Sequence, residues 1–372
     1  MIKLLNSYLK AKHMMPACYC FLSRFALFRG LCRNIRYIII SRLYALWNAS
    51  GVQTEKYTCT LPWEYAAVKA DGRVTCSTFH RSRDELFFGN INEQSFSEIW
   101  FGDRFQKLRG LVRKPGSALP FLCYTCPYKI ESHGISELPL IPDFPKVLWV
   151  ESTDACSLNC PGCLHREDRK DLELSYNTFQ KTINEIGKHL STIVFYIDGE
   201  NYLHPEAMEM TRYAKLVNPE LRIHTSTNGL MFYGTERQID FVRSGVDSVI
   251  FSIDGAYQDS YSRYRKGGDL STALNNMRGV IEQKRRLGIE LDVTWRYILF
   301  KWNDSDEEMD HARDIAAEMG VDSLIWLITK TVNHSERFLP DGISSYKVKI
   351  PIERFEATET ASKEIAHNQT YA

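Results

Sequence analysis

The stretch Val147-Leu148-Trp149-Val150 is followed, after five further residues, by Cys156-Ser157-Leu158-Asn159-Cys160-Pro161-Gly162-Cys163. The apolar run predicts a buried strand, which places the three cysteines in the loop at its carboxyl end. Three closely spaced thiolates can hold three irons of a [4Fe–4S] cube and leave the fourth iron without a protein ligand. An open iron suits a small molecule that must be ligated and then reduced. Structural zinc sites usually have four ligands in C-x2-C pairs, so they fit this triplet poorly.

Further apolar runs recur along the chain, with amphipathic helical patterns over 175–190, 270–287 and 306–319 between them. With the first run they predict six strands, at 147–150, 193–197, 221–225, 248–253, 291–300 and 324–328. Alternating strands and helices indicate parallel strands joined by right-handed crossovers. Six strands over about 180 residues suit an open barrel better than a closed eight-stranded one. The expected fold class is therefore α/β, with a partial (β/α)6 barrel over 145–332.

Polar segments stand at the carboxyl ends of the second, third and fourth predicted strands, where barrels collect ligand groups. These segments are Asp198-Gly199-Glu200-Asn201, Ser226-Thr227-Asn228-Gly229, and Ser252-Ile253-Asp254-Gly255 with the nearby Arg263 and Arg265. Each segment alone is a weak signal. Together with the cysteine loop, in order and each at a strand end, they form a strong one. Arg296 ends the fifth strand, but no catalytic acid or base is singled out.

The cysteine spacing and these segments resemble those of the radical S-adenosylmethionine (SAM) enzymes over about residues 145 to 330. The resemblance implies a [4Fe–4S] cluster on Cys156, Cys160 and Cys163 that chelates SAM and breaks its C–S bond to give a 5′-deoxyadenosyl radical. It also implies SAM contacts from Gly199, Glu200, Ser226, Asn228, Ser252, Arg263 and Arg265. Three positions depart from the family: Asp198 and Asn201 replace the first Gly and the Pro of G-G-E-P, and Gly162 replaces a frequent aromatic residue beside the adenine.

Residues 55–135 contain four more cysteines, Cys59, Cys76, Cys123 and Cys126. Asp71-Gly72 predicts a hairpin between 65–68 and 73–75, and a helix is predicted over 95–108. The region resembles the SPASM/Twitch module, which follows the barrel in most relatives and precedes it here. The resemblance implies one fully ligated auxiliary [4Fe–4S] cluster. Four cysteines in paired spacing suit zinc equally well, so that alternative stays open.

Residues 1–54 carry basic but no acidic side chains and show helical periodicity. This segment either packs on the catalytic domain or rests, through 1–50, on a membrane surface or a partner protein. Cys18, Cys20 and Cys32 within it are expected to be buried small hydrophobic residues rather than ligands. The tail over 333–372 is polar.

The chain has 46 basic and 46 acidic residues, so no overall field points to nucleic acid. No apolar run approaches the roughly 18 to 20 residues of a membrane span, and the start of the chain lacks a signal-peptide layout. Cysteine ligands need a reducing compartment, so a cytoplasmic protein is expected.

These features predict a radical SAM enzyme that abstracts hydrogen from a small molecule, a sugar conjugate or a peptide. A flavodoxin or ferredoxin is the expected electron donor, and the auxiliary cluster would aid an oxidation or a cross-link. Two alternatives remain. A radical SAM epimerase needs a thiol that returns a hydrogen atom, and a non-catalytic metal-binding scaffold would dock a partner or a membrane.

Overall fold

A computed structural model describes most of the chain between residues 57 and 338, and one strand beyond. The described residues are 57–78, 86–114, 119–120, 123, 126, 130–131, 138–139, 142–163, 169–329, 333–338 and 348–350. The predicted helical segment 1–54, with Cys18, Cys20 and Cys32, lies outside them. The chain divides into two compact units, one of residues 1–63 with 103–142 and one of residues 64–102 with 143–372.

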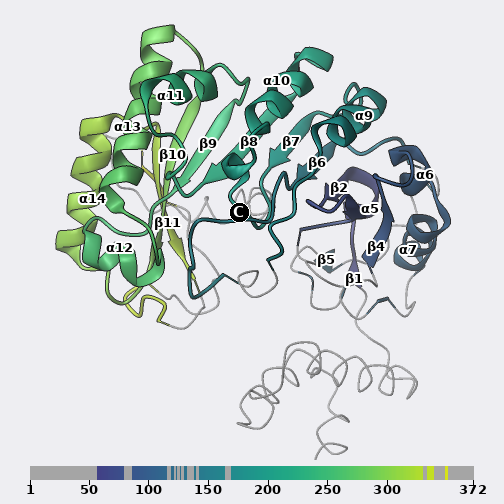
Figure 1. Ribbon diagram of the computed structural model, residues 1–372. Coiled ribbons are helices and arrows are strands. Elements are labelled where there is room, and N and C mark those ends of the chain that lie inside the picture. The colour runs from purple at the N-terminus through teal and green to yellow at the C-terminus, as the bar shows by residue number, and fades with distance from the viewer. Residues whose placement is uncertain are drawn as a thin grey trace, which may run out of the picture. The chain divides into compact units, whose positions relative to one another are not determined.

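A ten-stranded sheet is the framework of the second unit (Figure 1). Its strands, in spatial order, are β12 (Val348–Ile350), β11 (Ser323–Ile328), β10 (Asp292–Leu299), β9 (Ser248–Ser252), β8 (Arg222–Thr227), β7 (Thr192–Phe195), β6 (Val147–Val150), β2 (Tyr65–Val68), β3 (Arg73–Thr75) and β4 (Phe87–Asn90). The run from β11 to β2 is parallel throughout. The outer strands β12, β3 and β4 are antiparallel to their neighbours.

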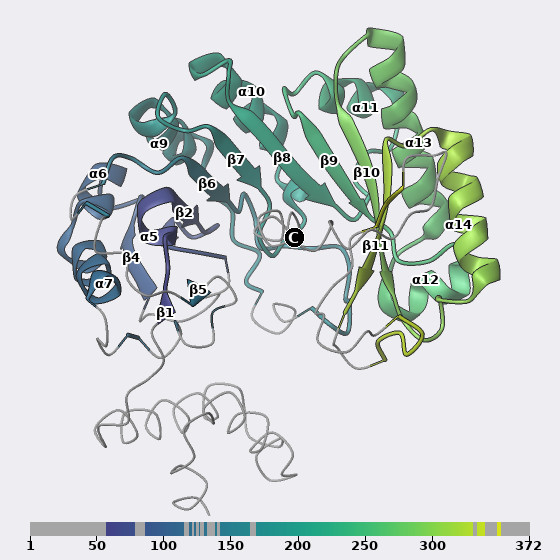
Figure 2. The same cartoon turned by 180° about the vertical axis from the view of Figure 1, so that it is seen from behind.

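The six strands predicted from the apolar runs are β6 to β11, and each matches to within two residues at both ends. The expected α/β fold with a partial barrel is therefore confirmed. The connecting helices lie on one face of the sheet, and Figure 2 shows its opposite face. They are α9 (Tyr176–Ile186), α10 (Ala207–Val217), α11 (Thr235–Val242), α13 (Leu270–Leu287) and α14 (Asp306–Met319).

Burial alternates along the strands because successive side chains point to opposite faces of the sheet. In β10, Val293, Trp295, Tyr297 and Leu299 are buried, whereas the residues between them keep partial exposure. The fully buried set packs under the helices. The half-exposed set, which includes Arg296, lines the inner face of the partial barrel.

Helix boundaries follow the local capping signals. Ser175 and Ser305 each accept a backbone N–H of the first helical turn, at α9 and α14 respectively. α13 and α14 end at Gly288 and Gly320, whose φ angles of 63° and 69° lie in the left-handed region that glycine favours. Two shorter helical elements, η2 (Asn201–Leu203) and α12 (Gln258–Tyr264), follow β7 and β9.

The predicted hairpin at 65–75 is confirmed as β2 and β3, and Gly72 in its turn has φ 82°. The predicted helix over 95–108 is instead two helices, α6 (Phe96–Trp100) and α7 (Asp103–Arg113). The break falls at Phe101-Gly102, where the backbone N–H of Phe101 bonds back to Ser97 and Ile99 and closes α6. Ser95 caps α6 in a capping box with Glu98.

The first unit contains α7 and a two-stranded antiparallel pair, β1 (Tyr57–Thr58) with β5 (Ile130–Glu131). A short helix, α5 (Leu61–Glu64), leads into β2. Part of the tail expected to be polar forms β12, which pairs with β11. Within the described part of the chain, no helix combines the length and apolar character needed to cross a membrane.

One contact fixes α6 against α9. The half-buried Glu185 on α9 accepts the backbone N–H of Phe96 at 2.9 Å and that of Ser97 at 2.7 Å, and also the Ser97 hydroxyl. These are N-terminal donors that the helix itself cannot satisfy. The carboxylate thus completes the cap of α6 and docks it on the barrel.

We predict that Glu185→Ala lowers the free energy of unfolding by about 1–3 kcal/mol, because it leaves those donors without an acceptor. Urea unfolding followed by circular dichroism measures the change. Glu282→Ala, at an exposed position on α13, is the matched control and should stay near the wild-type value. Equal losses in the two variants would contradict the capping role of Glu185.

Candidate functional site

The cysteine loop leaves the carboxyl end of β6 and is anchored on two sides. The Asp154 carboxylate accepts the backbone N–H of Leu172 at 2.6 Å and that of Lys170 at 3.2 Å. On the other side, the backbone N–H of Asn159 donates to the carbonyl of Lys266 at 2.9 Å. These bonds hold the loop in place through the protein's own backbone.

Each of the three loop sulfurs faces a side-chain N–H donor, and Cys156 Sγ also faces the backbone N–H of Leu158 at 3.5 Å. The pairs are Asn228 Nδ2 to Cys156 Sγ at 3.9 Å, Arg265 Nη1 to Cys160 Sγ at 3.9 Å and Arg169 Nη2 to Cys163 Sγ at 3.7 Å. None of the three cysteines forms a disulfide. Burial raises the pKa of Cys156 and of Cys160, and the Arg265 guanidinium opposes that rise. Three unlinked sulfurs, each beside a donor, fit thiolate ligands of an iron–sulfur cluster, since donors stabilise their negative charge.

Arg169 also fastens the loop backbone. Its Nη1 donates to the carbonyl of Leu158 at 2.7 Å and to that of Cys156 at 3.2 Å. One guanidinium therefore joins two loop carbonyls and one loop sulfur, a use of several donors in one plane that a lysine cannot match.

Residues 198–200, after β7, pack directly against the cysteine loop. The backbone N–H of Glu200 donates to the carbonyl of Ala155 at 2.7 Å. A Cβ atom at Gly199 would lie 2.8 Å from that same carbonyl and would overlap the carbonyl of Thr153. Only glycine allows the two backbones to approach this closely.

Glu200 then ties this segment to the end of β8. Its buried carboxylate accepts the Thr227 hydroxyl at 2.8 Å and the backbone N–H of Asn228 at 2.7 Å. Burial raises the pKa of Glu200 to about 7, and these two hydrogen bonds oppose the rise. Because Asn228 Nδ2 also lies 3.2 Å from the Ser157 hydroxyl, the connection continues into the cysteine loop.

Ser226, Ser252 and Arg296 meet on the inner face of the barrel. Arg296 Nη2 lies 2.7 Å from the Ser252 hydroxyl and 3.4 Å from that of Ser226, and the two hydroxyls are 3.2 Å apart. No carboxylate of the described residues forms an ion pair with Arg296, and its buried Nε has no acceptor among them. Burial lowers the pKa of Arg296. The group fits a carboxylate ligand, which would give this guanidinium its counter-ion.

The two arginines after β9 lie in different surroundings. Arg265 Nε pairs with Asp254 Oδ2 at 2.5 Å, whereas Arg263 is exposed on α12. Burial by itself lowers the pKa of Arg265, but Asp254 raises it above its usual value. The ring of Tyr264 lies against Gly162, where an added Cβ would be 3.0 Å from the phenol oxygen. An aromatic ring thus stands beside the position before the third cysteine, although it comes from α12.

The four cysteines of the N-terminal region are divided between the two units. Cys59, Cys123 and Cys126 belong to the first and Cys76, buried after β3, to the second. Cys123 and Cys126 share one turn, in which the backbone N–H of Cys126 donates to the carbonyl of Cys123 at 3.4 Å.

Comparison with protein families agrees with this site. Residues 150–315 match the family model of the radical SAM superfamily, and residues 59–127 match the SPASM model, an iron–sulfur cluster-binding domain. The protein belongs to the radical SAM superfamily. It is a radical SAM enzyme of the SPASM type, with a SAM-binding [4Fe–4S] cluster and an auxiliary iron–sulfur cluster. The SPASM match stands before the barrel in the sequence.

Several solved structures show distant similarity. SuiB from Streptococcus suis bound to S-adenosylmethionine is 13% identical, with a TM-score of 0.39, over 49% of this chain and 40% of that one. Methylornithine synthase (PylB) is 13% identical, with a TM-score of 0.40, over 60% and 61%. A radical SAM methyltransferase from Sphaerobacter thermophilus is 18% identical, with a TM-score of 0.38, over 49% and 56%.

The match covers less than half the length of SuiB. A search of curated proteins found no match.

The residues expected to contact SAM lie in different parts of the structure. Ser226 and Ser252 are brought together, and Asn228 lies beside the cysteine loop. Gly199 and Glu200 join the loops after β6, β7 and β8, and Arg265 faces Asp254 and a loop sulfur. Arg263 is not brought to the site. Sequence reasoning missed Arg169, because a single arginine six positions after the third cysteine carries no recognisable pattern.

We predict that Gly199→Ala lowers the iron content of the anaerobically reconstituted enzyme by about half, since one of two cubes would be lost. The added methyl group pushes residues 198–200 away from the carbonyls of the cysteine loop. Gly110→Ala in α7 is the control, because nothing lies within 4 Å of a Cβ added there. Wild-type iron content in Gly199→Ala would refute the close-packing argument.

Proposed function

We propose that this radical SAM enzyme cleaves SAM reductively at the cysteine loop and abstracts a hydrogen atom from its substrate. The observation that carries the proposal is the set of three loop sulfurs, each beside an N–H donor, together with Arg296, for which the described residues provide no carboxylate partner. Cys156, Cys160 and Cys163 would hold a [4Fe–4S] cluster, which would supply the electron for cleavage of the C–S bond of SAM to a 5′-deoxyadenosyl radical.

The barrel residues bind and orient SAM in this proposal. Arg296, with the Ser226 and Ser252 hydroxyls, binds the carboxylate of SAM. Its guanidinium then gains the anion that the described residues do not provide. Gly199 and Glu200 face the ammonium group, and that positive charge would keep the Glu200 carboxyl ionised. Asn228, Arg169 and Arg265 stabilise the sulfur ligands.

The N-terminal cysteines, Cys59, Cys76, Cys123 and Cys126, are proposed to ligate the auxiliary cluster. That cluster would supply an acceptor for the electron left on a substrate radical, and the net reaction would then be an oxidation or a cross-link. A flavodoxin or ferredoxin would deliver the first electron in the cytoplasm. A small molecule, a sugar conjugate and a peptide all remain candidate substrates.

Iron counting tests the assignment of the two cysteine sets. We predict about eight irons per wild-type chain after anaerobic reconstitution. Replacing Cys156, Cys160 and Cys163 by alanine should leave about four and abolish 5′-deoxyadenosine release with dithionite. Replacing the four N-terminal cysteines should also leave about four, yet keep 5′-deoxyadenosine release.

Two outcomes would contradict this assignment. Release of 5′-deoxyadenosine by the triple variant would place the SAM cluster elsewhere. A count of about four irons and one zinc in the wild-type protein would show that the N-terminal cysteines hold zinc instead of an iron–sulfur cluster.

Arg296→Met is predicted to weaken SAM binding about 10- to 100-fold, the loss expected for charge-assisted hydrogen bonds of about 1.5–3 kcal/mol. Equilibrium dialysis of labelled SAM against the reconstituted enzyme measures the dissociation constant. Arg263→Met removes an exposed guanidinium from α12 and should bind SAM like the wild type. Equal affinities in the two variants would show that Arg296 does not contribute to SAM binding.

A further inference from the structure

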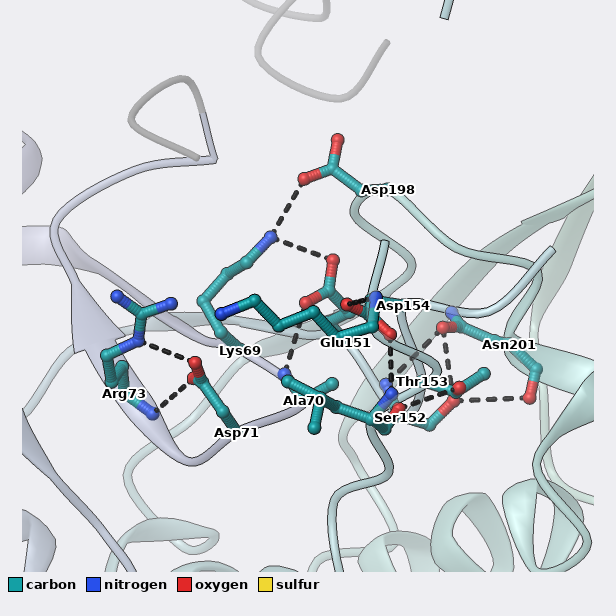
Figure 3. A network of polar contacts seen from close by, with 12 residues as sticks. Lys69, Ala70, Asp71, Arg73, Glu151, Ser152, Thr153, Asp154, Asp198 and Asn201 are labelled. Atoms are coloured by element: carbon teal, nitrogen blue, oxygen red, sulfur yellow. Dashed lines mark hydrogen bonds and ion pairs between the residues drawn. The ribbon is translucent and has the colours of Figure 1, made fainter. Parts of the chain in front are cut away.

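A buried ionic network lies at the carboxyl edge of the sheet, outside the groups discussed so far (Figure 3). Lys69 Nζ is 2.7 Å from Glu151 Oε1 and 2.8 Å from Asp198 Oδ2. The second oxygen of Glu151 accepts the backbone N–H of Ala70 at 3.1 Å. One cation therefore joins two carboxylates.

Strand register explains why these residues meet. β2 and β6 are parallel neighbours, with Val68 opposite Val150, so Lys69 and Glu151 emerge side by side. Asp198 follows β7, the strand on the other side of β6. Lys69 is the member that comes from the SPASM-matched segment, residues 59–127.

The side chains of the network are almost completely buried. The Lys69 side chain is 5% exposed, and those of Glu151 and Asp198 are 1% and 0% exposed. Burial by itself lowers the pKa of Lys69, but the two carboxylates raise it above its usual value. Burial raises the pKa of Glu151, against the attraction of Lys69. Loss of the lysine would remove the cation that lies between these two buried carboxylates, which is unfavourable.

Asp198 directly precedes the two residues that connect the cysteine loop to β8. Gly199 packs on the carbonyls of Thr153 and Ala155, and Glu200 bonds to Thr227 and Asn228. A shift of Asp198 therefore moves residues on both sides of the loop. The ion pair with Lys69 is a side-chain tether on this segment that runs back to β2.

We propose that Lys69 is a positioning residue of the SAM site, which acts through Asp198 to hold residues 198–200 against the cysteine loop. The N-terminal SPASM segment then contributes to SAM binding as well as to the auxiliary cluster. This inference rests on the proposed assignment of Gly199 and Glu200 to SAM.

The first test is the dissociation constant of SAM in reconstituted Lys69→Met. We expect it to rise about 10- to 100-fold, the range seen when residues supporting a ligand shell are removed. The electron paramagnetic resonance signal of the reduced cluster should also respond less to added SAM. Arg73→Met is the control, since Arg73 forms a partly exposed pair with Asp71 on the same hairpin and should bind SAM like wild type.

Asp198→Asn keeps the proposal testable if Lys69→Met fails to fold. It leaves Lys69 and Glu151 as a neutral pair, so the fold should persist while the tether weakens. We expect the same loss of SAM affinity, with no further loss in the double variant, because both changes break one connection. Wild-type SAM affinity in Asp198→Asn, or additive losses in the double variant, would overturn the proposal.

The wild-type measurement separates this inference from the proposed function. If the wild-type enzyme neither binds SAM nor releases 5′-deoxyadenosine, the proposed function fails, and this inference fails with it. If the wild type binds SAM and Arg296→Met weakens binding, while Lys69→Met and Asp198→Asn do not, only the role of Lys69 is overturned.

Discussion

The close approach of residues 198–200 to the cysteine loop is the constraint on which the rest of the site depends. Gly199 leaves no room for a side chain beside the carbonyls of Thr153 and Ala155, and the N–H of Glu200 donates to the second of these. The loops after β6 and β7 therefore form one backbone layer. The buried Glu200 carboxylate extends that layer to β8, so the ends of three parallel strands are fixed relative to one another.

The basic side chains at this edge of the sheet differ in whether a carboxylate lies beside them. Lys69 and Arg265 are each matched by buried carboxylates within the protein. Arg296 has two hydroxyl partners and no carboxylate among the described residues. Because a cation removed from water without an anion is costly, Arg296 is the residue that we propose to bind a ligand. The ion pairs of Lys69 and Arg265 hold the framework together.

Much of the fold and part of the site could be predicted because their signals are local. Apolar runs located β6 to β11, and the helical pattern over 306–319 located α14. The contacts of Lys69 and Arg169 could not be predicted, because they depend on which strands become neighbours and on how one loop closes. The ring beside Gly162 illustrates the same limit, since Tyr264 arrives from α12, about a hundred residues later.

The order of segments along the chain has a structural consequence at β6. Without β2, this first strand of the barrel would leave one edge of backbone N–H and carbonyl groups unpaired. The hairpin strand β2 pairs with that edge in parallel and carries Lys69 to the level of Glu151. Covering the edge and supplying the lysine are therefore results of one strand pairing. A change that displaced β2 would expose the edge of β6. It would also move Lys69 away from Glu151 and Asp198. The pairing of β2 and the stability of the SAM site are therefore expected to be linked.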